Sequence, residues 1–329
     1  MPAPTVFRRP LIVRLRHWVG DVTLGLPTLQ RLHDAGYSLR LVGKGWAKDL
    51  LAGTGWPVHT LPGTLRDRVA LLRRLRQEAL AEDPGFTRRL NTLCLPYSFG
   101  SALECRLAGL RALGHAYEGR SLLLSRSVAR PTGQHELAVY WQLGSALLQA
   151  DAPLPTTLGL RPSPEQAAQA QALMAAQGLA PGFIVLCPFA GGTYAGQDKT
   201  WPDFPAFAAA LVARATHPVL LCPGPGEEEA VAARDYPGCT VLRGVKLGTY
   251  AALLQQAAVM VANDTGPGHM AAAVGTPLLS VLGPSDPAQW GAWGPGVQYL
   301  QGPEAGAWPH LAQVDSALQA LLPTPPQRG

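Results

Sequence analysis

The sequence predicts an α/β protein built from two parallel sheets. Short apolar runs alternate with helix-compatible segments through both halves of the chain, which is typical of βαβ units. A proline-rich stretch without periodicity, residues 151–164, separates the halves and is the best linker candidate. The 329 residues, 47% of them hydrophobic, suffice for two separate cores. We therefore expect domains at residues 1–155 and 165–310, followed by a C-terminal helix and tail at 311–329.

The elements of the first half follow from two patterns. A short aliphatic run, such as Leu11-Ile12-Val13-Arg14-Leu15, predicts a buried strand, whereas apolar residues three or four positions apart predict a helix. Strands are expected at 11–15, 39–43 and 92–95. Helices are expected at 21–32, 64–78, 101–110 and 136–149, and the 64–78 segment is basic and amphipathic.

The same alternation restarts after the linker candidate, so the second half predicts a second parallel sheet. Strands are expected at 183–187, 218–222, 239–242, 258–262 and 278–282. Helices are expected at 164–177, 204–214, 227–235, 247–257 and 268–274. A last helix is expected at 311–322.

Charge divides the chain unevenly. Residues 1–161 carry 21 Lys and Arg against 11 Asp and Glu, whereas residues 162–329 carry 6 against 11. A basic half indicates an anionic partner. No aromatic-interleaved basic motif or recognisable binding module is present, so we expect no nucleic acid partner. An anionic membrane surface, a phosphorylated substrate and a generally basic solvated surface stay open.

Cysteine spacing and hydropathy argue against other protein classes. The five cysteines show no C-x-x-C spacing, so neither a disulfide nor a zinc site is expected. No apolar run approaches the roughly 20 residues that span a bilayer. Residues 1–10 lead into a strand-like run rather than the apolar segment of a signal peptide. We expect a cytoplasmic protein.

The most informative stretch is residues 263–276, Asn-Asp-Thr-Gly-Pro-Gly-His-Met-Ala-Ala-Ala-Val-Gly-Thr. It joins the expected strand 258–262 to a helix, and at such a junction free backbone N–H groups and the helix dipole attract an anion. Gly266 and Gly268 would let a ligand approach the main chain. One interpretation is a phosphate or nucleotide site, and the other is a capped helix after a strand. His269 either points into the anion site or packs.

Three further places after strands could carry chemistry. In Gly20-Asp21, the carboxylate is either an ordinary helix cap or a general base facing a ligand. Lys199 follows a glycine-bearing loop with Thr193, which is either a phosphate cradle or a solvated surface loop. Glu227 begins an expected helix. Its negative charge either interacts favourably with the positive end of the helix dipole or its carboxylate binds ribose hydroxyls.

Taken together and in this order, these places resemble glycosyltransferase family 9, the ADP-heptose:lipopolysaccharide heptosyltransferases. The resemblance runs over nearly the whole chain. Its segments are Ile12-Val13-Arg14-Leu15, Gly20-Asp21-Val22, Leu26-Pro27-Thr28-Leu29, Lys199-Thr200-Trp201-Pro202, Phe207, the Gly224/Glu227 loop, residues 263–270 and Gly283-Pro284-Ser285-Asp286-Pro287.

The resemblance implies a GT-B fold, in which two Rossmann-like lobes with parallel sheets flank a central cleft. It implies an inverting transfer of heptose from ADP-heptose to a lipopolysaccharide core acceptor, with no metal and no bound cofactor. The partners implied are a nucleotide-sugar donor, an anionic glycolipid acceptor and the inner face of the cytoplasmic membrane. The acceptor site belongs to the first lobe and the nucleotide-sugar site to the second.

The same resemblance assigns roles to individual residues. Asp21 is the general base, and Lys199 contacts the donor phosphates. The donor contacts it implies are Thr193, Lys199, Glu227, Asp264, Thr265, Gly266 and His269. The acceptor contacts are Arg14, Gly20 and Asp21.

Two departures leave the identity of donor and acceptor open. The residues before Gly20, Arg16-His17-Trp18-Val19, are bulkier than the small residues usual there, and the loop at 189–197 also differs. Two alternative functions stay possible. A nucleotide-sugar 2-epimerase on the same fold would turn over donor without an acceptor. In a non-catalytic nucleotide-binding protein, substitution of Asp21 would change nothing measurable.

Overall fold

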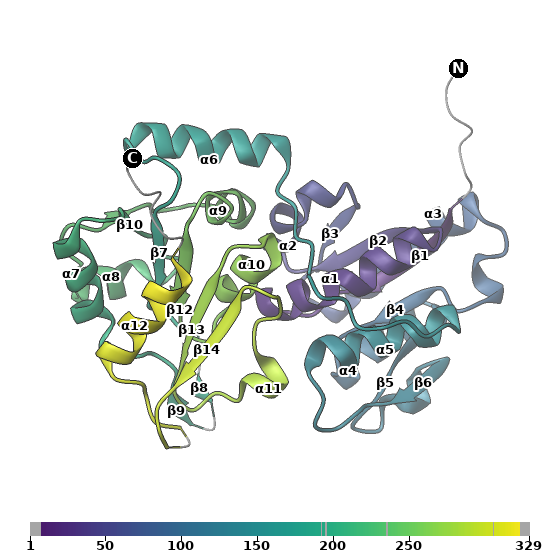
Figure 1. The fold of residues 1–329 in the computed structure, drawn as a ribbon. Helices are drawn as coiled ribbons and strands as arrows, with labels where there is room; N and C mark the ends of the chain where they lie inside the picture. The colour runs from purple at the N-terminus through teal and green to yellow at the C-terminus, as the bar shows by residue number, and fades with distance from the viewer. Residues whose placement is uncertain (1–7, 192, 195, 235, 305, 323–329) are drawn as a thin grey trace. The chain divides into compact units, whose positions relative to one another are not determined.

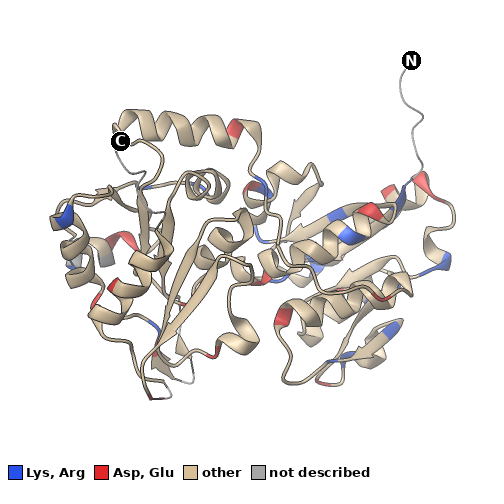
Figure 2. Cartoon of the chain, in the orientation of Figure 1, with Lys and Arg blue, Asp and Glu red and all other residues tan. Residues whose placement is uncertain are grey.

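The computed structural model describes residues 8–191, 193–194, 196–234, 236–304 and 306–322. The chain divides into two units, residues 1–155 and 156–329, and each has its own six-stranded sheet (Figure 1). Basic residues concentrate on the first unit (Figure 2). Within the described ranges, every helix is too short or too polar to cross a membrane.

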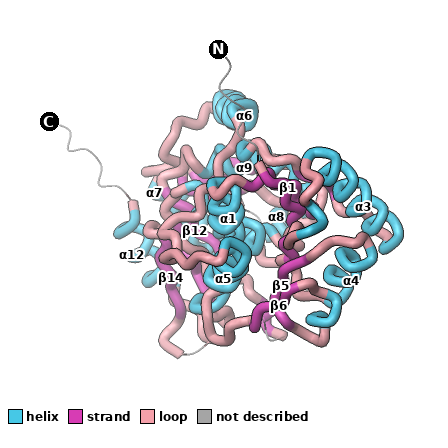
Figure 3. Tube along the Cα trace, turned by 90° about the vertical axis from the view of Figure 1, so that its right-hand side faces the viewer, coloured by secondary structure: helices cyan, strands magenta, loops and turns pink. Residues whose placement is uncertain are grey.

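The first unit is a sheet with helices on both faces. Its strands are β1 (Arg9–Arg14), β2 (Tyr37–Gly43), β3 (Val58–Thr60), β4 (Thr92–Cys94), β5 (Ala112–Ala116) and β6 (Arg126–Ala129). Its helices are α1 (Val19–Asp34), α2 (Trp46–Leu50), α3 (Leu65–Glu82), α4 (Phe99–Leu107) and α5 (Glu136–Leu148), with 3₁₀ turns at Ala52–Thr54, Phe86–Arg88 and Arg120–Leu123. Helices α1 and α5 lie on one side of the sheet and α3 and α4 on the other (Figure 3). Because both faces are covered, β1 is buried from Pro10 to Arg14.

The second unit repeats this plan. Its sheet contains β7 (Ile184–Cys187), β10 (Val219–Leu221), β11 (Thr240–Val241), β12 (Val259–Ala262), β13 (Leu278–Leu282) and β14 (Val297–Gln301). Its helices are α6 (Pro164–Ala176), α7 (Phe204–Arg214), α8 (Glu228–Arg234), α9 (Leu247–Leu254), α10 (Gly266–Val274), α11 (Pro287–Trp290) and α12 (Leu311–Leu321). A short antiparallel hairpin, β8 (Thr193–Tyr194) and β9 (Gln197–Asp198), follows β7.

Both six-stranded sheets have the same strand order. The first runs β3-β2-β1-β4-β5-β6 and the second β11-β10-β7-β12-β13-β14, and neighbouring strands are parallel throughout. Numbered from the start of each unit, both follow the 3-2-1-4-5-6 order of a Rossmann-like sheet. The predicted α/β class with two Rossmann-like lobes is therefore confirmed.

Residues 151–163 of the expected linker contain no helix or strand and Pro164 begins α6, but the second part of the segment is held in place. Leu158 and Leu160 are buried, and the Leu160 N–H donates to the Ala273 carbonyl at 2.9 Å. These residues therefore pack with the second unit rather than forming a free connection. The C-terminal helix α12 packs on β13, and Asp315 in it accepts from Arg214 of α7 at 2.7 Å.

Candidate active site

Each sheet has one point where the strand order reverses, between β1 and β4 in the first unit and between β7 and β12 in the second. In doubly wound sheets, ligands bind beyond the carboxyl ends of the strands at this point. Asp21 lies in the helix that follows β1, and Asp264 lies two residues after the end of β12. The sequence-predicted residues thus flank the expected binding position in each unit.

Asp21 is the third residue of α1 and is only 8% exposed. It is not the helix cap, because Trp18 occupies that position. Its carboxylate has two described partners from outside the helix. The Tyr140 hydroxyl of α5 donates to Oδ1 at 2.8 Å, and the Arg16 guanidinium lies 3.5 Å from Oδ2. These contacts hold the carboxylate in one orientation at the edge of the sheet.

Arg16 belongs to a cluster of stacked groups, which we call the Arg–Tyr–Arg stack and which consists of Arg16, Tyr97 and Arg130. The two guanidinium carbons lie 4.3 and 4.5 Å from the centroid of the Tyr97 ring. The Tyr97 hydroxyl donates to buried Glu136, which also pairs with Arg130 at 3.2 Å. Cation–π contacts of this kind attract a guanidinium to the face of the ring, so they hold the Arg16 and Arg130 side chains in place.

Burial keeps Tyr140 protonated, so it can only donate to the carboxylate. Desolvation raises the pKa of Tyr140 well above its usual value, and the neighbouring Asp21 charge raises it further. Burial also lowers the pKa of Arg16, but the neighbouring Tyr140, Asp21 and other groups outweigh this and leave that pKa raised. Sequence reasoning missed Tyr140 and Tyr97. The packing of α5 on α1 brings Tyr140 to Asp21, and the loop after β4 brings Tyr97 to Arg16. No local sequence pattern reveals these contacts.

The two other residues predicted to bind an acceptor are buried. Arg14 is 1% exposed, and its guanidinium donates to Glu104 at 2.9 Å and to the Val42 carbonyl at 3.1 Å. Gly20 lies in the first turn of α1, and its carbonyl accepts from Thr23 at 2.7 Å. The Arg14 contacts join β1 to β2 and α4, which is a structural role. Its predicted contact with an acceptor stays a prediction.

In the second unit, Lys199 follows β9 in the chain, and its side chain reaches the residues just before α10. Its ammonium group donates to the Asp264 carbonyl at 3.2 Å and lies 3.6 Å from the Asp264 carboxylate. Its side chain is 16% exposed, so the interpretation as a solvated surface lysine is not supported. The N-cap residue Thr265 makes no side-chain capping bond, and Gly266 begins the helix. The structure thus brings Lys199, Asp264, Thr265 and Gly266 together.

A buried tryptophan explains how Lys199 reaches this place. Trp201 is fully buried, and its backbone N–H donates to the Asn263 side chain at 3.0 Å. Its indole N–H donates to the Pro309 carbonyl at 3.1 Å. The hydrogen bond between Asn263 and the Trp201 backbone therefore connects the loop after β9 to the end of β12. Asn263 acts as a positioning residue that the sequence analysis did not single out.

Three other residues were predicted to contact the donor: Glu227, Thr193 and His269. Glu227 accepts from the Gly224 N–H at 2.7 Å, and burial raises its pKa. Thr193 is exposed in the β8–β9 hairpin. The described hydrogen bonds and ion pairs of these two residues do not include Lys199 or Asp264. His269 is buried in α10 at 7% exposure, and its contact with a donor stays a prediction.

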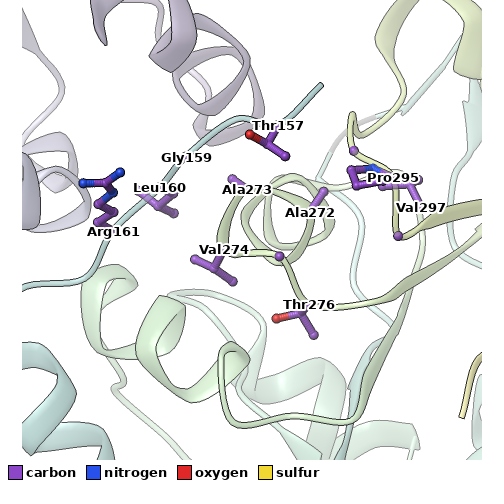
Figure 4. Close-up of a pocket in the computed structure, with 13 residues that line it drawn as sticks. Thr157, Gly159, Leu160, Arg161, Ala272, Ala273, Val274, Thr276, Pro295 and Val297 are labelled. Atoms are coloured by element: carbon purple, nitrogen blue, oxygen red, sulfur yellow. The ribbon is translucent and has the colours of Figure 1, made fainter. Parts of the chain in front are cut away.

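A cavity of about 270 Å³ lies at the other end of α10 (Figure 4). Its lining includes Ala272, Ala273, Thr276 and Pro295. Since a nine-residue helix is about 13 Å long, this cavity is separate from the group around Lys199. In the ranges that the structure describes, no cluster of three or more His, Cys, Asp or Glu residues is placed to hold a metal ion.

Comparison with solved structures bears on the fold. The chain superposes on the Escherichia coli ADP-heptose lipopolysaccharide heptosyltransferase II with a TM-score of 0.78 and 22% identity, covering 95% of this chain and 98% of that one. It superposes on the E. coli heptosyltransferase WaaC with ADP with a TM-score of 0.70 and 21% identity, covering 95% and 99%. At these identities the likeness shows a shared fold.

Sequence comparison bears on the family. The chain is 31% identical over 125 residues to the lipopolysaccharide heptosyltransferase 3 of E. coli. This match spans 35% of this chain and 35% of the length of that relative. Residues 89–320 match the model of glycosyltransferase family 9 (heptosyltransferase), which is more than half of the chain. The family predicted from the order of the motifs is confirmed, and the chain belongs to glycosyltransferase family 9.

Proposed function

We propose that this protein transfers heptose from ADP-heptose to an acceptor in the lipopolysaccharide core, with inversion and without a metal ion. Family membership and the relatives named above support this proposal. Two observations carry it, one in each unit: Tyr140 donates a hydrogen bond to the buried Asp21 carboxylate, and Lys199 bonds the Asp264 carbonyl just before the first residue of α10. Residues 1–155 would bind the acceptor and residues 165–310 the donor, in the cytoplasm.

The mechanism is a single displacement. Asp21 takes the proton of an acceptor hydroxyl while that oxygen attacks the anomeric carbon of the donor sugar. The bond from this carbon to the diphosphate oxygen breaks, and ADP leaves with the bonding electrons. Negative charge then builds on the diphosphate. Lys199 and the N–H groups at the start of α10 stabilise that charge, because fixed donors aimed at developing charge are effective catalysts.

Substrate contacts beyond these two groups are part of the same proposal. Asp264, Thr265, Gly266 and His269 would surround the diphosphate and its sugar, with Thr193 and Glu227 contributing from their loops. Gly20 and Arg14 would contribute to the acceptor side. The basic excess of the first part of the chain supports an anionic acceptor, since residues 1–161 carry 21 Lys and Arg against 11 Asp and Glu.

Binding measurements test the donor. We expect calorimetry to show selective binding of ADP over UDP and GDP, tighter binding of ADP-heptose, and unchanged affinity in excess EDTA. A preference for UDP or GDP would change the substrate but keep the enzyme class. A clear metal requirement would contradict the metal-independent mechanism. Turnover of donor in the absence of any acceptor would favour an epimerase, and no nucleotide binding would contradict the proposal altogether.

Tyr140→Phe tests whether Asp21 is held in a productive orientation. Since Tyr140 donates the hydrogen bond to Oδ1, its loss should lower kcat by roughly 10–10²-fold with KM little changed, as expected when a catalytic group is misplaced. Steady-state transfer rates at saturating donor provide the measurement. Tyr37→Phe, at the opposite end of β2 from the site, is the control and should leave kcat unchanged. An unaltered kcat in Tyr140→Phe would show that Asp21 needs no such support.

A further inference from the structure

The partners of Asp21 belong to a larger network of polar groups inside the first unit. Glu136 begins α5 and is fully buried, and Tyr140 follows it by four residues, so the two side chains lie on the same face of that helix. Tyr140 donates to Asp21. The Tyr97 hydroxyl donates to one oxygen of the Glu136 carboxylate, and the Arg130 guanidinium donates to the other at 3.2 Å. One face of α5 therefore contacts two acids.

The charges of this network balance in pairs. The Arg16 guanidinium lies 3.5 Å from the Asp21 carboxylate, and the Arg130 guanidinium lies 3.2 Å from Glu136. Both guanidinium groups also stack on the Tyr97 ring, at 4.3 and 4.5 Å from its centroid. Two cations that share one ring repel each other, so each needs an acid of its own. Glu136 is the acid that binds the second cation.

The other titratable side chains that face this network are uncharged. Burial raises the pKa of both Tyr97 and Tyr140, so both stay protonated. The His115 ring on β5 lies 6.0 Å from the Tyr97 ring, and burial lowers the pKa of His115, so it is neutral near pH 7. Arg31 also contacts α5, but it lies ten residues after Asp21 and about 15 Å further along α1. The charges of the network are therefore those of two arginines and two acids.

This balance bears on how readily Asp21 accepts a proton. A cation near a carboxylate stabilises its charged form and makes it a weaker base, whereas a nearby negative charge has the opposite effect. Without the charge of Glu136, Arg130 and Arg16 would share Asp21 as their only acid in the network. The Asp21 carboxylate would then take a proton less readily.

We propose that Glu136 is a positioning residue for Asp21: it holds Arg130 and so limits the positive charge that reaches the Asp21 carboxylate through the Arg–Tyr–Arg stack. Asp21 thereby stays basic enough to take the proton of an acceptor. The inference rests on the proposed function, in which Asp21 is the general base. The family resemblance does not imply this arrangement, because Arg16 is one of the residues before Gly20 that differ from the small residues usual there.

Carbon NMR of the full-length protein, labelled at its aspartate carboxyl carbons, tests the proposal without any substrate. The Asp21 signal is assigned by its absence in Asp21→Asn. Glu136→Gln keeps the shape and removes the charge, so the midpoint of the Asp21 titration should move to lower pH by roughly one pH unit, the lower end of the effect of a nearby charge. Arg130→Gln leaves Glu136 without its cation and should move the midpoint to higher pH. The double variant should titrate close to the unaltered protein, because it loses one charge of each sign.

The pH profile of transfer provides a second readout. The acid limb of kcat should move in the same direction as the NMR midpoint in each variant, since it reports protonation of the base. On the plateau, Glu136→Gln should lower kcat by about threefold with KM little changed, because a weaker base transfers a proton less effectively. Glu165→Gln is the matched control. Glu165 also lies in the first turn of a helix, α6, but it is exposed and in the other unit, so neither readout should change.

The direction of the two shifts separates positioning from a merely structural role. A midpoint that stays in place, or that moves the same way in Glu136→Gln and Arg130→Gln, would overturn the proposal. Circular dichroism verifies folding, and Arg130→Gln by itself tests the sign of the shift if Glu136→Gln does not fold. Opposite shifts in a protein that transfers no sugar, or whose Asp21→Asn variant is fully active, would keep the positioning role and contradict the proposed function instead.

Discussion

Asp21→Asn is expected to lower the turnover number of glycosyl transfer by about 10²–10⁴-fold, the usual contribution of a general base. Asparagine has the same shape as aspartate and can accept the Tyr140 hydrogen bond, but it cannot take a proton at neutral pH. The substitution therefore removes the proposed chemistry and leaves most of the packing. Nucleotide affinity should stay near normal, because the residues proposed to bind the donor lie in the other unit. Transfer rates and calorimetry with ADP measure the two effects.

Asp34→Asn provides the control for this substitution. Asp34 is the last residue of the same helix and is exposed, so the change alters net charge equally without touching the site. We expect its transfer rate to match that of the unaltered protein. Full activity in Asp21→Asn would show that Asp21 is not the base. Loss of nucleotide binding or of folding in that variant would instead assign Asp21 a structural role.

Lys199→Met should lower the transfer rate by about 10²–10³-fold, which is typical for the loss of one donor that stabilises developing charge. The methionine side chain fills similar space, so the change chiefly removes the positive charge beside Asp264. Binding of ADP should weaken more than binding of adenosine, because only ADP carries the diphosphate that the ammonium group would contact. Calorimetry with both ligands separates the loss of a phosphate contact from a general disturbance of the site.

Lys246→Met is the matched control for Lys199→Met. Lys246 is an exposed lysine of the same unit that precedes α9, and its removal changes the net charge by the same amount. Its ADP affinity and transfer rate should be unchanged. Lys199→Arg, which keeps the charge, should recover part of the ADP affinity. If Lys199→Met bound ADP as tightly as the unaltered protein, Lys199 would not contact the diphosphate.

The elements that the sequence predicted best are those with a strong local pattern. The helices predicted at 164–177 and 204–214 agree with α6 and α7. Both helices have a proline in their first turn, which is a local signal for a helix start. Strands such as β5, Ala-Leu-Gly-His-Ala, were missed because they lack a run of branched aliphatic residues and form by pairing with their neighbours. β14 was missed because it is an edge strand whose residues are half-buried or exposed.

The start of α1 shows the same limit at the candidate site. Sequence reasoning began this helix at residue 21, where aspartate would be a good cap, whereas the helix begins at Val19. Asp21 is consequently inside the first turn and free to bond Tyr140. The stretch from Asn263 shows a similar limit, because its pattern does not tell which partner each residue has. In the structure the Asn263 side chain accepts from the Trp201 backbone, whereas the Asp264 carbonyl accepts from Lys199.

The sequence by itself determined the fold class and the family, because both are carried by local features in a fixed order: apolar runs, helix signals and short motifs after strands. Only the tertiary structure decided which side chains meet. Tyr140 bonds Asp21 from 119 residues away, and Lys199 bonds the Asp264 carbonyl from 65 residues away. Such contacts arise from the packing of α5 on α1 and from the order of the strands, and packing between distant segments leaves no mark in the neighbouring sequence.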